Sequence, residues 1–141
     1  MKRILMSLVV SAALVPAAAL ACDGENKAEV SSIKKLTVAE LAKDKAAKIF
    51  DANSAVTRAK NGTIPGAVLL TSSSSYDLKE LPAAKDASLV FYCASTMCSA
   101  SEGPAKRAVE AGYTHVAVLP DGIKGWKAAG QKTVPFKAPN S

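Results

Sequence analysis

The chain has 141 residues, which is enough for one domain of ordinary size. Its 18 Lys and Arg against 12 Asp and Glu give a net charge of +6, and only 5% of the residues are aromatic. Scattered lysines with few aromatics among them do not favour a nucleic-acid site, so the charge is interpreted as a solvated basic surface. Such a surface attracts small anionic ligands through weak electrostatic steering.

The first 21 residues have the three-part pattern of a secretory signal peptide. Lys2 and Arg3 begin it, residues 4–15 are almost unbroken apolar sequence, and Ala19-Leu20-Ala21 offers small residues for cleavage. A membrane anchor is the competing interpretation, but the apolar run is shorter than the roughly 20 residues that a span needs. The pattern therefore predicts export, to the periplasm of a bacterium. Cleavage leaves 16 basic and 12 acidic residues, a net charge of +4.

Cys22 follows directly after the predicted signal peptide, residues 1–21, and two interpretations of it stay open. Ala-Leu-Ala-Cys resembles a bacterial lipobox imperfectly, because Leu is unusual at the second position before the Cys. Plain cleavage after Ala21 fits equally well. A lipid on Cys22 would anchor the protein to a membrane without spanning it, and no other membrane contact is predicted. Residues 22–35 are then a linker or tether.

The next part of the chain predicts a helix, two strands and a long loop. Thr37 and Glu40 are spaced as a capping box that opens a helix. A buried strand ends on Asp51. In chain order, the predicted elements are the helix at 36–44, the strand at 48–51, the loop at 52–66 and the second strand at 67–70.

The clearest strand is residues 88–92, a continuous apolar run of the kind found in strands covered on both faces. A helix at 105–111 stopped by Gly112, a strand at 115–119 and a helix at 122–129 follow it. Strands that alternate with helices predict βαβ units and a mostly parallel sheet.

Two cysteines stand just after the clearest strand, in the stretch FYCASTMCSAS at 91–101. Cys93 lies at the carboxyl end of this strand and Asp51 at the carboxyl end of another, where α/β sheets carry their sites. Backbone N–H groups of the loop and of the following helix are expected to surround the thiol and lower its pKa. Ser101, rather than Ser99, is the predicted helix cap, because Pro104 then falls where no N–H is needed.

Other interpretations of the cysteines remain. If Cys93 has no functional role, it is a small buried apolar residue at a strand end. If Cys98 has none, it only lines the loop. A structural disulfide between them would close a small ring and add little stability.

Several other kinds of site are disfavoured. His115 opens its strand, opposite Cys93, which excludes a Cys–His hydrolase pair. Two cysteines and one distant histidine are too few for a metal, and no cofactor motif is present. A cysteine phosphatase loop would want an arginine at position 99, which is Ser.

Four segments, in this order, resemble a single-domain rhodanese, the sulfurtransferase fold, over about residues 36–131. They are the strand end Phe50-Asp51, the turn Gly62-Thr63-Ile64-Pro65-Gly66-Ala67, the strand Val90-Phe91-Tyr92-Cys93, and Pro120-Asp121-Gly122-Ile123-Lys124-Gly125-Trp126. The resemblance implies an α/β domain at 36–132, with a central, mostly parallel sheet of about five strands flanked by helices. Residues 133–141 are predicted to be a C-terminal tail.

The resemblance also implies the chemistry. Cys93 would be the nucleophile that carries sulfane sulfur as a persulfide, taken from a donor such as thiosulfate and passed to a thiophilic acceptor. The partners would be a small sulfur-containing anion and a thiol or similar acceptor, without a cofactor. Asp51 would order nearby backbone N–H groups and Trp126 would pack in the core. The active-site loop would consist of Ala94, Ser95, Thr96, Met97, Cys98 and Ser99.

The chain departs from the family pattern at three positions. Asn53 stands where an arginine is frequent, Thr63 replaces a histidine, and Cys98 replaces an arginine of the loop. The loop therefore has no charge with which to bind an anionic donor. The alternative function is a catalytically weak rhodanese-like module that binds a partner or works as a thiol-redox couple of Cys93 and Cys98.

Overall fold

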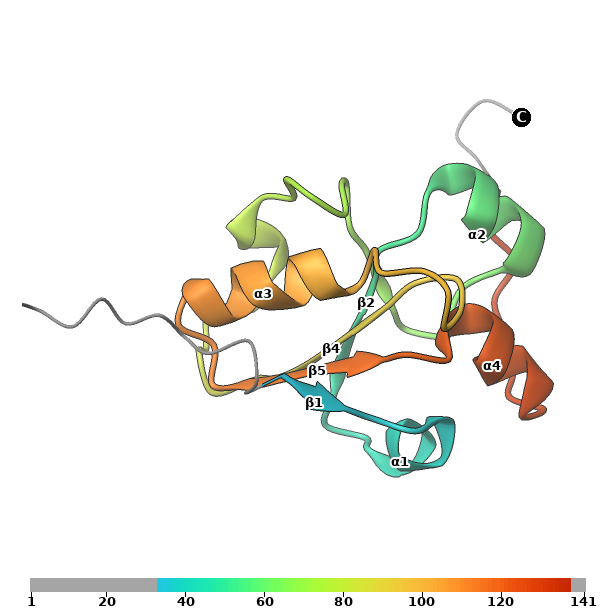
Figure 1. Cartoon of the computed structure of the whole chain (residues 1–141), viewed down its shortest axis with the longest axis horizontal. Coiled ribbons are helices and arrows are strands. Elements are labelled where there is room, and N and C mark those ends of the chain that lie inside the picture. The colour runs from blue at the N-terminus through green and yellow to red at the C-terminus, as the bar shows by residue number, and fades with distance from the viewer. Residues whose placement is uncertain (1–32, 138–141) are drawn as a thin grey trace, which may run out of the picture.

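The computed structural model describes residues 33–137, which form a five-stranded parallel sheet flanked by helices (Figure 1). The strand order is β1-β5-β4-β2-β3. The strands are β1 (Lys34–Lys35), β2 (Lys48–Asp51), β3 (Val68–Leu69), β4 (Ser88–Tyr92) and β5 (His115–Leu119). The predicted α/β fold is therefore confirmed. The predicted signal peptide and Cys22 lie outside the described residues.

Helices cover both faces of the sheet. They are α1 (Val38–Lys43), α2 (Ala55–Asn61), α3 (Glu102–Glu110) and α4 (Gly122–Ala128), with a 3-10 turn, η2, at Leu78–Glu80. Helix α3 lies on one face, and α1 and α4 lie on the other (Figure 1). Among the described residues, no helix combines the length and the apolar character that crossing a membrane requires.

The central strand β4 contributes to two cores because successive side chains of a strand point to opposite faces. Leu89 and Phe91 pack toward α3, and Phe91 stacks on Phe50 with ring centroids 5.1 Å apart. Val90 and Tyr92 pack toward α1 and α4. Because both faces are covered, the strand is apolar throughout, as its sequence indicated.

Several elements have the predicted bounds. Strands β4 and β5 match the predictions residue for residue, and Thr37 and Glu40 form the predicted capping box at the start of α1. The prediction of a loop at 52–66 was wrong, because α2 lies inside it. Its signal was Ser54, whose hydroxyl accepts a hydrogen bond from the N–H of Thr57 and begins the helix.

Both predicted boundaries of the domain need correction. Lys34 and Lys35, assigned to the tether, pair with β5 as strand β1. In the predicted tail, Val134 exchanges two backbone hydrogen bonds of 2.9 Å with Thr63. Neither segment has an apolar pattern that the sequence analysis could recognise. Each joins the domain through a pairing partner that is distant in sequence.

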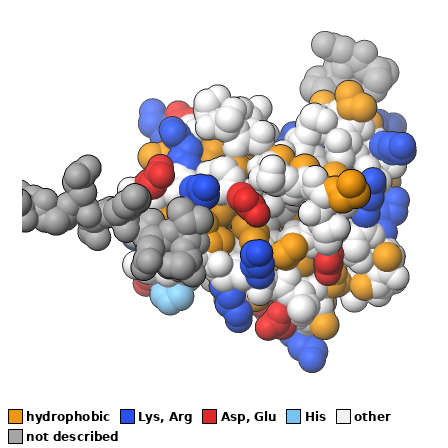
Figure 2. All heavy atoms as spheres, viewed as in Figure 1, with side chains coloured by type: hydrophobic (Ala, Val, Ile, Leu, Met, Phe, Trp, Pro, Cys, Tyr) orange, Lys and Arg blue, Asp and Glu red, His pale blue; other side chains and the backbone are white. Residues whose placement is uncertain are grey.

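Charged side chains are spread over the surface. Figure 2 shows Lys and Arg on several sides of the visible face, interspersed with acidic and uncharged side chains. This arrangement agrees with a solvated basic surface.

The start of α4 holds the residues that follow β4. The N–H groups of Ile123 and Lys124 donate to the carbonyl oxygens of Cys93 and Ala94, at 2.9 and 3.0 Å. Gly122 has a φ of +58° and touches the same backbone: a Cβ there would lie 2.7 Å from the carbonyl carbon of Ala94 and would also meet the carbonyl oxygen of Cys93. Only glycine combines this conformation with this approach.

We expect Gly122→Ala to lower the free energy of unfolding by about 2–4 kcal/mol, because it adds overpacking to backbone strain. Urea denaturation measures the change. Gly112→Ala is the matched control, because Gly112 also has a positive φ, of +89°, but faces open space. We expect that variant to lose only about 1 kcal/mol. Equal losses in the two variants would show that the contact with the Cys93 segment is unimportant.

Candidate active site

Cys93 and Asp51 lie at the same edge of the sheet, as predicted. Asp51 is paired in register with Tyr92, the residue before Cys93, and the N–H of Ala52 donates to the carbonyl oxygen of Tyr92 at 2.9 Å. Ser88 pairs with His115 at the opposite edge. His115 is thus exposed and separated from Cys93 by the length of the strands.

The loop after β4 folds back on itself. The N–H of Cys98 donates to the carbonyl oxygen of Ser95 at 2.9 Å, which closes a tight turn around Thr96 and Met97. Met97 is 96% exposed at its tip. The turn brings Cys98 next to Cys93 although five positions separate them.

Carbonyl oxygens surround the sulfur of Cys93. Its thiol donates to the carbonyl oxygen of Cys98 at 2.7 Å and lies 3.8 Å from that of Ser95. The hydroxyl of Ser101 donates to the sulfur at 3.7 Å. Cys93 has no exposed surface. The loop therefore covers the thiol and holds its proton.

The predicted lowering of the Cys93 pKa is wrong for this loop conformation. Burial raises the pKa of Cys93, and the neighbouring Cys98 raises it further, whereas Ser101 acts in the opposite direction. The backbone N–H groups that were expected to lower the pKa of Cys93 act on Cys98 instead. Burial of Cys98 is outweighed by the N–H groups of Ala94 and Ala100 and by the Cys93 thiol, which together lower the pKa of Cys98. In the reduced loop, the thiolate therefore forms on Cys98 first.

Ser101 has a role that the sequence did not reveal. It precedes α3, as predicted, and its carbonyl accepts from the N–H of Ala105 at 3.3 Å. Its hydroxyl makes no capping hydrogen bond and points instead to the sulfur of Cys93. The only available signal was that a Ser stands at the junction of loop and helix, and that signal equally fits a cap.

Asp51 is the centre of a buried network. Its carboxylate accepts from the N–H of Asn53 at 2.7 Å, from Nε of Arg58 at 3.3 Å and from the hydroxyl of Tyr92. That hydroxyl also accepts from the N–H of Ile64 at 3.1 Å. Burial, and next the carboxylate of Asp51, raise the pKa of Tyr92. Asp51 thus orders the backbone behind Cys93, which is the supporting role it was given.

Arg58 is committed to this network. Its Nη2 donates to the carbonyl oxygens of Asp51 and Leu70, at 2.8 and 2.9 Å, and the residue is only 8% exposed. Its place in the unpredicted helix α2 explains why the sequence could not assign this role. The guanidinium holds β2 to the segment after β3 instead of reaching into the Cys93 loop.

A polar cavity of about 350 Å³ opens at the carboxyl ends of β2 and β3. Ala52 lines this cavity, and its N–H donates a hydrogen bond to the carbonyl oxygen of Tyr92, the residue before Cys93. The buried Nδ2 of Asn53 has no hydrogen-bond partner within residues 33–137. The other polar side chains of its wall are Ser54, Arg58, Thr71, Ser72 and Ser73.

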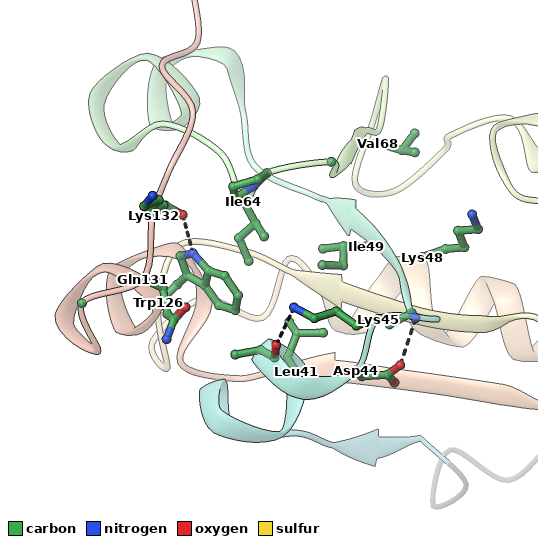
Figure 3. Close-up of a pocket in the computed structure, with 15 residues that line it drawn as sticks. Leu41, Asp44, Lys45, Lys48, Ile49, Ile64, Val68, Trp126, Gln131 and Lys132 are labelled. Carbon is green, nitrogen blue, oxygen red and sulfur yellow. Dashed lines mark hydrogen bonds between the residues drawn. The ribbon is translucent and has the colours of Figure 1, made fainter.

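A larger cavity of about 610 Å³ lies away from the thiols. Figure 3 shows Ile49, Ile64 and Trp126 around it, with Lys45, Lys48 and Lys132 among its labelled residues. No cysteine lines this cavity. Trp126 is nearly buried and its indole N–H donates to the carbonyl oxygen of Lys132 at 2.8 Å (Figure 3), which agrees with a packing role.

Between residues 33 and 137, no three His, Cys, Asp or Glu side chains are grouped as metal ligands. Cys93 and Cys98 are not joined by a disulfide. The reactive groups of this edge are therefore two thiols and the hydroxyl of Ser101.

An α/β domain with a thiol loop between a central strand and a helix defines the class of this protein. The profile of the family described as "Rhodanese-like domain" matches residues 35–129. The chain therefore belongs to the rhodanese-like domain family, as the sequence motifs suggested. No curated protein matches it significantly.

Solved structures share the fold at low identity. A Rhodopseudomonas palustris protein of unknown function, described as a possible tyrosine phosphatase, is 25% identical with a TM-score of 0.58, over 73% of this chain and 86% of its own. A rhodanese-like domain protein from Staphylococcus aureus is 23% identical with a TM-score of 0.54, over 75% and 100%. A thiosulfate sulfurtransferase from Pseudomonas aeruginosa is 22% identical with a TM-score of 0.56, over 77% and 22%. The neighbours of this fold thus include sulfurtransferases.

We expect Asp51→Asn to lower the free energy of unfolding by about 3–5 kcal/mol, because it leaves the buried Arg58 without a counter-charge. Urea denaturation measures the loss. Glu80→Gln is the control, since Glu80 accepts hydrogen bonds from Thr71 at the surface, and we expect it to cost less than about 1 kcal/mol. A small effect of Asp51→Asn would contradict the central role of this network.

We expect iodoacetamide at pH 7 to label Cys98 before Cys93. Cys98 is more exposed and its pKa is lowered, whereas the raised pKa of Cys93 delays its thiolate to higher pH. Fragmentation of the labelled peptide locates each adduct. The preference should narrow as pH rises above the usual pKa of a thiol, and unfolding in urea should abolish it. Faster labelling of Cys93 at pH 7 would contradict this order.

Proposed function

We propose that this protein is a rhodanese-type sulfurtransferase that carries sulfane sulfur as a persulfide on Cys93. The observation that carries the proposal is the position of Cys93. It ends the central strand of a rhodanese-like domain, in a loop that leads into α3, with Ser101 donating to its sulfur. Sulfurtransferases among the structural neighbours support the same reaction class.

The transfer needs no cofactor. The Cys93 thiolate attacks the outer sulfur of a donor such as thiosulfate; the new S–S bond forms as the bond to the sulfite group breaks, and sulfite leaves with the electron pair. A thiophilic acceptor such as cyanide then attacks the outer sulfur of the persulfide, which returns Cys93 to a thiolate and yields thiocyanate.

The loop must open for this chemistry. Cys93 has no exposed surface and donates to the carbonyl oxygen of Cys98, so the donor reaches it only after that contact breaks. The backbone of Cys93 itself is held by α4, while Thr96, Met97 and Ser99 are exposed. We therefore expect the segment 95–99 to move and the base of the loop to stay in place.

The polar cavity beside Asn53 is the proposed place for a small sulfur-containing anion. Asn53 Nδ2 offers an unused donor there, and the wall contains serine and threonine hydroxyls. Arg58 is neutralised by Asp51, and the loop has no charged side chain. Binding of a doubly charged donor is therefore expected to be weak. A tyrosine phosphatase activity is disfavoured, because Ser99 and its neighbours supply no arginine for a phosphate.

A second candidate function is a thiol-redox module that transfers no sulfur. The raised pKa of Cys93 and the carbonyl oxygens around its sulfur favour this alternative. We also propose that the protein works after export, which rests on the pattern of residues 1–21. An oxidising compartment outside the cytoplasm permits either function.

We expect the reduced Cys98→Ser protein, in which Cys93 is the only thiol of the loop, to gain the mass of one sulfur atom when it is incubated with thiosulfate. Cys93→Ser should abolish the gain, because a serine hydroxyl does not form a persulfide. Intact-mass spectrometry measures the adduct. The matched control is Ser88→Ala in the same Cys98→Ser background, because Ser88 pairs with His115 at the other end of β4, and it should load like Cys98→Ser. Loading of the Cys93→Ser variant would sink the proposal, and absence of loading in every form would favour the redox module.

A further inference from the structure

Cys98 has a position that the transfer reaction does not use. The turn closed by Ser95 and Cys98 brings the backbone of Cys98 to the sulfur of Cys93, with 2.7 Å between that sulfur and the Cys98 carbonyl oxygen. The two cysteines thus lie next to each other inside one short loop, and their side chains interact. Among the described residues they are the only cysteines.

The two sulfurs have different hydrogen-bond partners, and this difference suits a pair of cysteines with different roles. Cys93 lies in contact with carbonyl oxygens and donates its proton, so it is held as a thiol. Cys98 is partly exposed, and the N–H groups of Ala94 and Ala100 together with the Cys93 thiol lower its pKa, against the effect of burial. When Cys93 carries a persulfide, the N–H groups of Ala94 and Ala100 still favour formation of a Cys98 thiolate beside it.

We propose that Cys98 is a second catalytic residue, which resolves the Cys93 persulfide by forming a Cys93–Cys98 disulfide and releasing hydrosulfide. The Cys98 thiolate attacks the inner sulfur, the S–S bond of the persulfide breaks, and the outer sulfur leaves with its electron pair as HS⁻. The persulfide itself is the oxidant, so no further reagent enters this step. The proposal rests on the proposed sulfur transfer to Cys93.

The intramolecular attack competes with any external acceptor. A thiol held in the same loop acts at a high effective concentration. This effective concentration is typically in the millimolar range for short flexible tethers, and it is higher when the groups are pre-organised. After loading, closure of the loop returns Cys98 to Cys93. The catalytic cycle then ends in a disulfide, and a dithiol reductant must regenerate the two thiols by exchange.

The experiment uses the chain with Cys22→Ser, so that only the two loop thiols remain, and adds Cys98→Ser, Cys93→Ser or, as a control at the other end of β4, Ser88→Ala. Reduced protein is incubated with thiosulfate without oxygen, and sulfide and intact mass are measured. The parent and Ser88→Ala should release about one sulfide per chain and lose the mass of two hydrogens. Cys98→Ser should keep one added sulfur and release none. A parent that keeps the sulfur as stably as Cys98→Ser would overturn the resolving role while leaving sulfur transfer intact.

A second reagent separates the two proposals. The aromatic disulfide 5,5′-dithiobis(2-nitrobenzoate) labels accessible thiols whether or not the protein transfers sulfur. On Cys93→Ser it should leave one stable adduct on Cys98. On the parent, Cys93 should displace that adduct, so that about two aromatic thiolates leave per chain and no adduct remains. If thiosulfate loads no form, the proposed function fails. A persistent adduct on the parent would then also overturn the pairing of the two cysteines.

Discussion

The buried carboxylate of Asp51 is the interaction on which the active edge of this fold depends. It accepts hydrogen bonds from Arg58 in α2, from Tyr92 at the end of β4 and from the backbone after β2. An ionised carboxylate without these partners would not tolerate burial, and a lone guanidinium would not either. The network therefore joins three elements into one arrangement and sets where the chain continues into Cys93.

The position of Cys93 is then fixed from two sides. Behind it, the Asp51 network fixes Tyr92; below it, the first turn of α4 binds the carbonyl oxygens of Cys93 and Ala94. The part of the loop that extends beyond these anchors is held by its own turn, by the contact of the Cys93 thiol with the Cys98 carbonyl oxygen and by the N–H of Glu102. A fixed Cys93 under a loop with fewer anchors suits the proposed reaction, in which a donor must enter and a persulfide must afterwards be shielded from water.

Replacement of the loop arginine by Cys98 changes the chemistry more than the fold. An uncharged loop does not attract an anion strongly, and in the proposed reactions the second thiol adds a redox step beside the sulfur transfer. The peptide groups of the loop present carbonyl oxygens to the sulfur of Cys93 and N–H groups to that of Cys98. With the proposed function, the protein would combine the scaffold of its family with a site in which two sulfur atoms, rather than one, determine the product.

The amino-acid sequence by itself determined the strands at 88–92 and 115–119, the parallel α/β class and the place of Cys93 and Asp51 at one edge. Apolar runs and turn residues are local signals, so they can be recognised along the chain. The tertiary structure alone decided which loop groups face each sulfur, the partners of Asp51 and the role of Ser101. It also placed β1, and the bridge of Val134 to Thr63, in the fold. These features depend on contacts between residues far apart in sequence and on the direction of backbone dipoles. Neither can be recognised from the types of neighbouring residues.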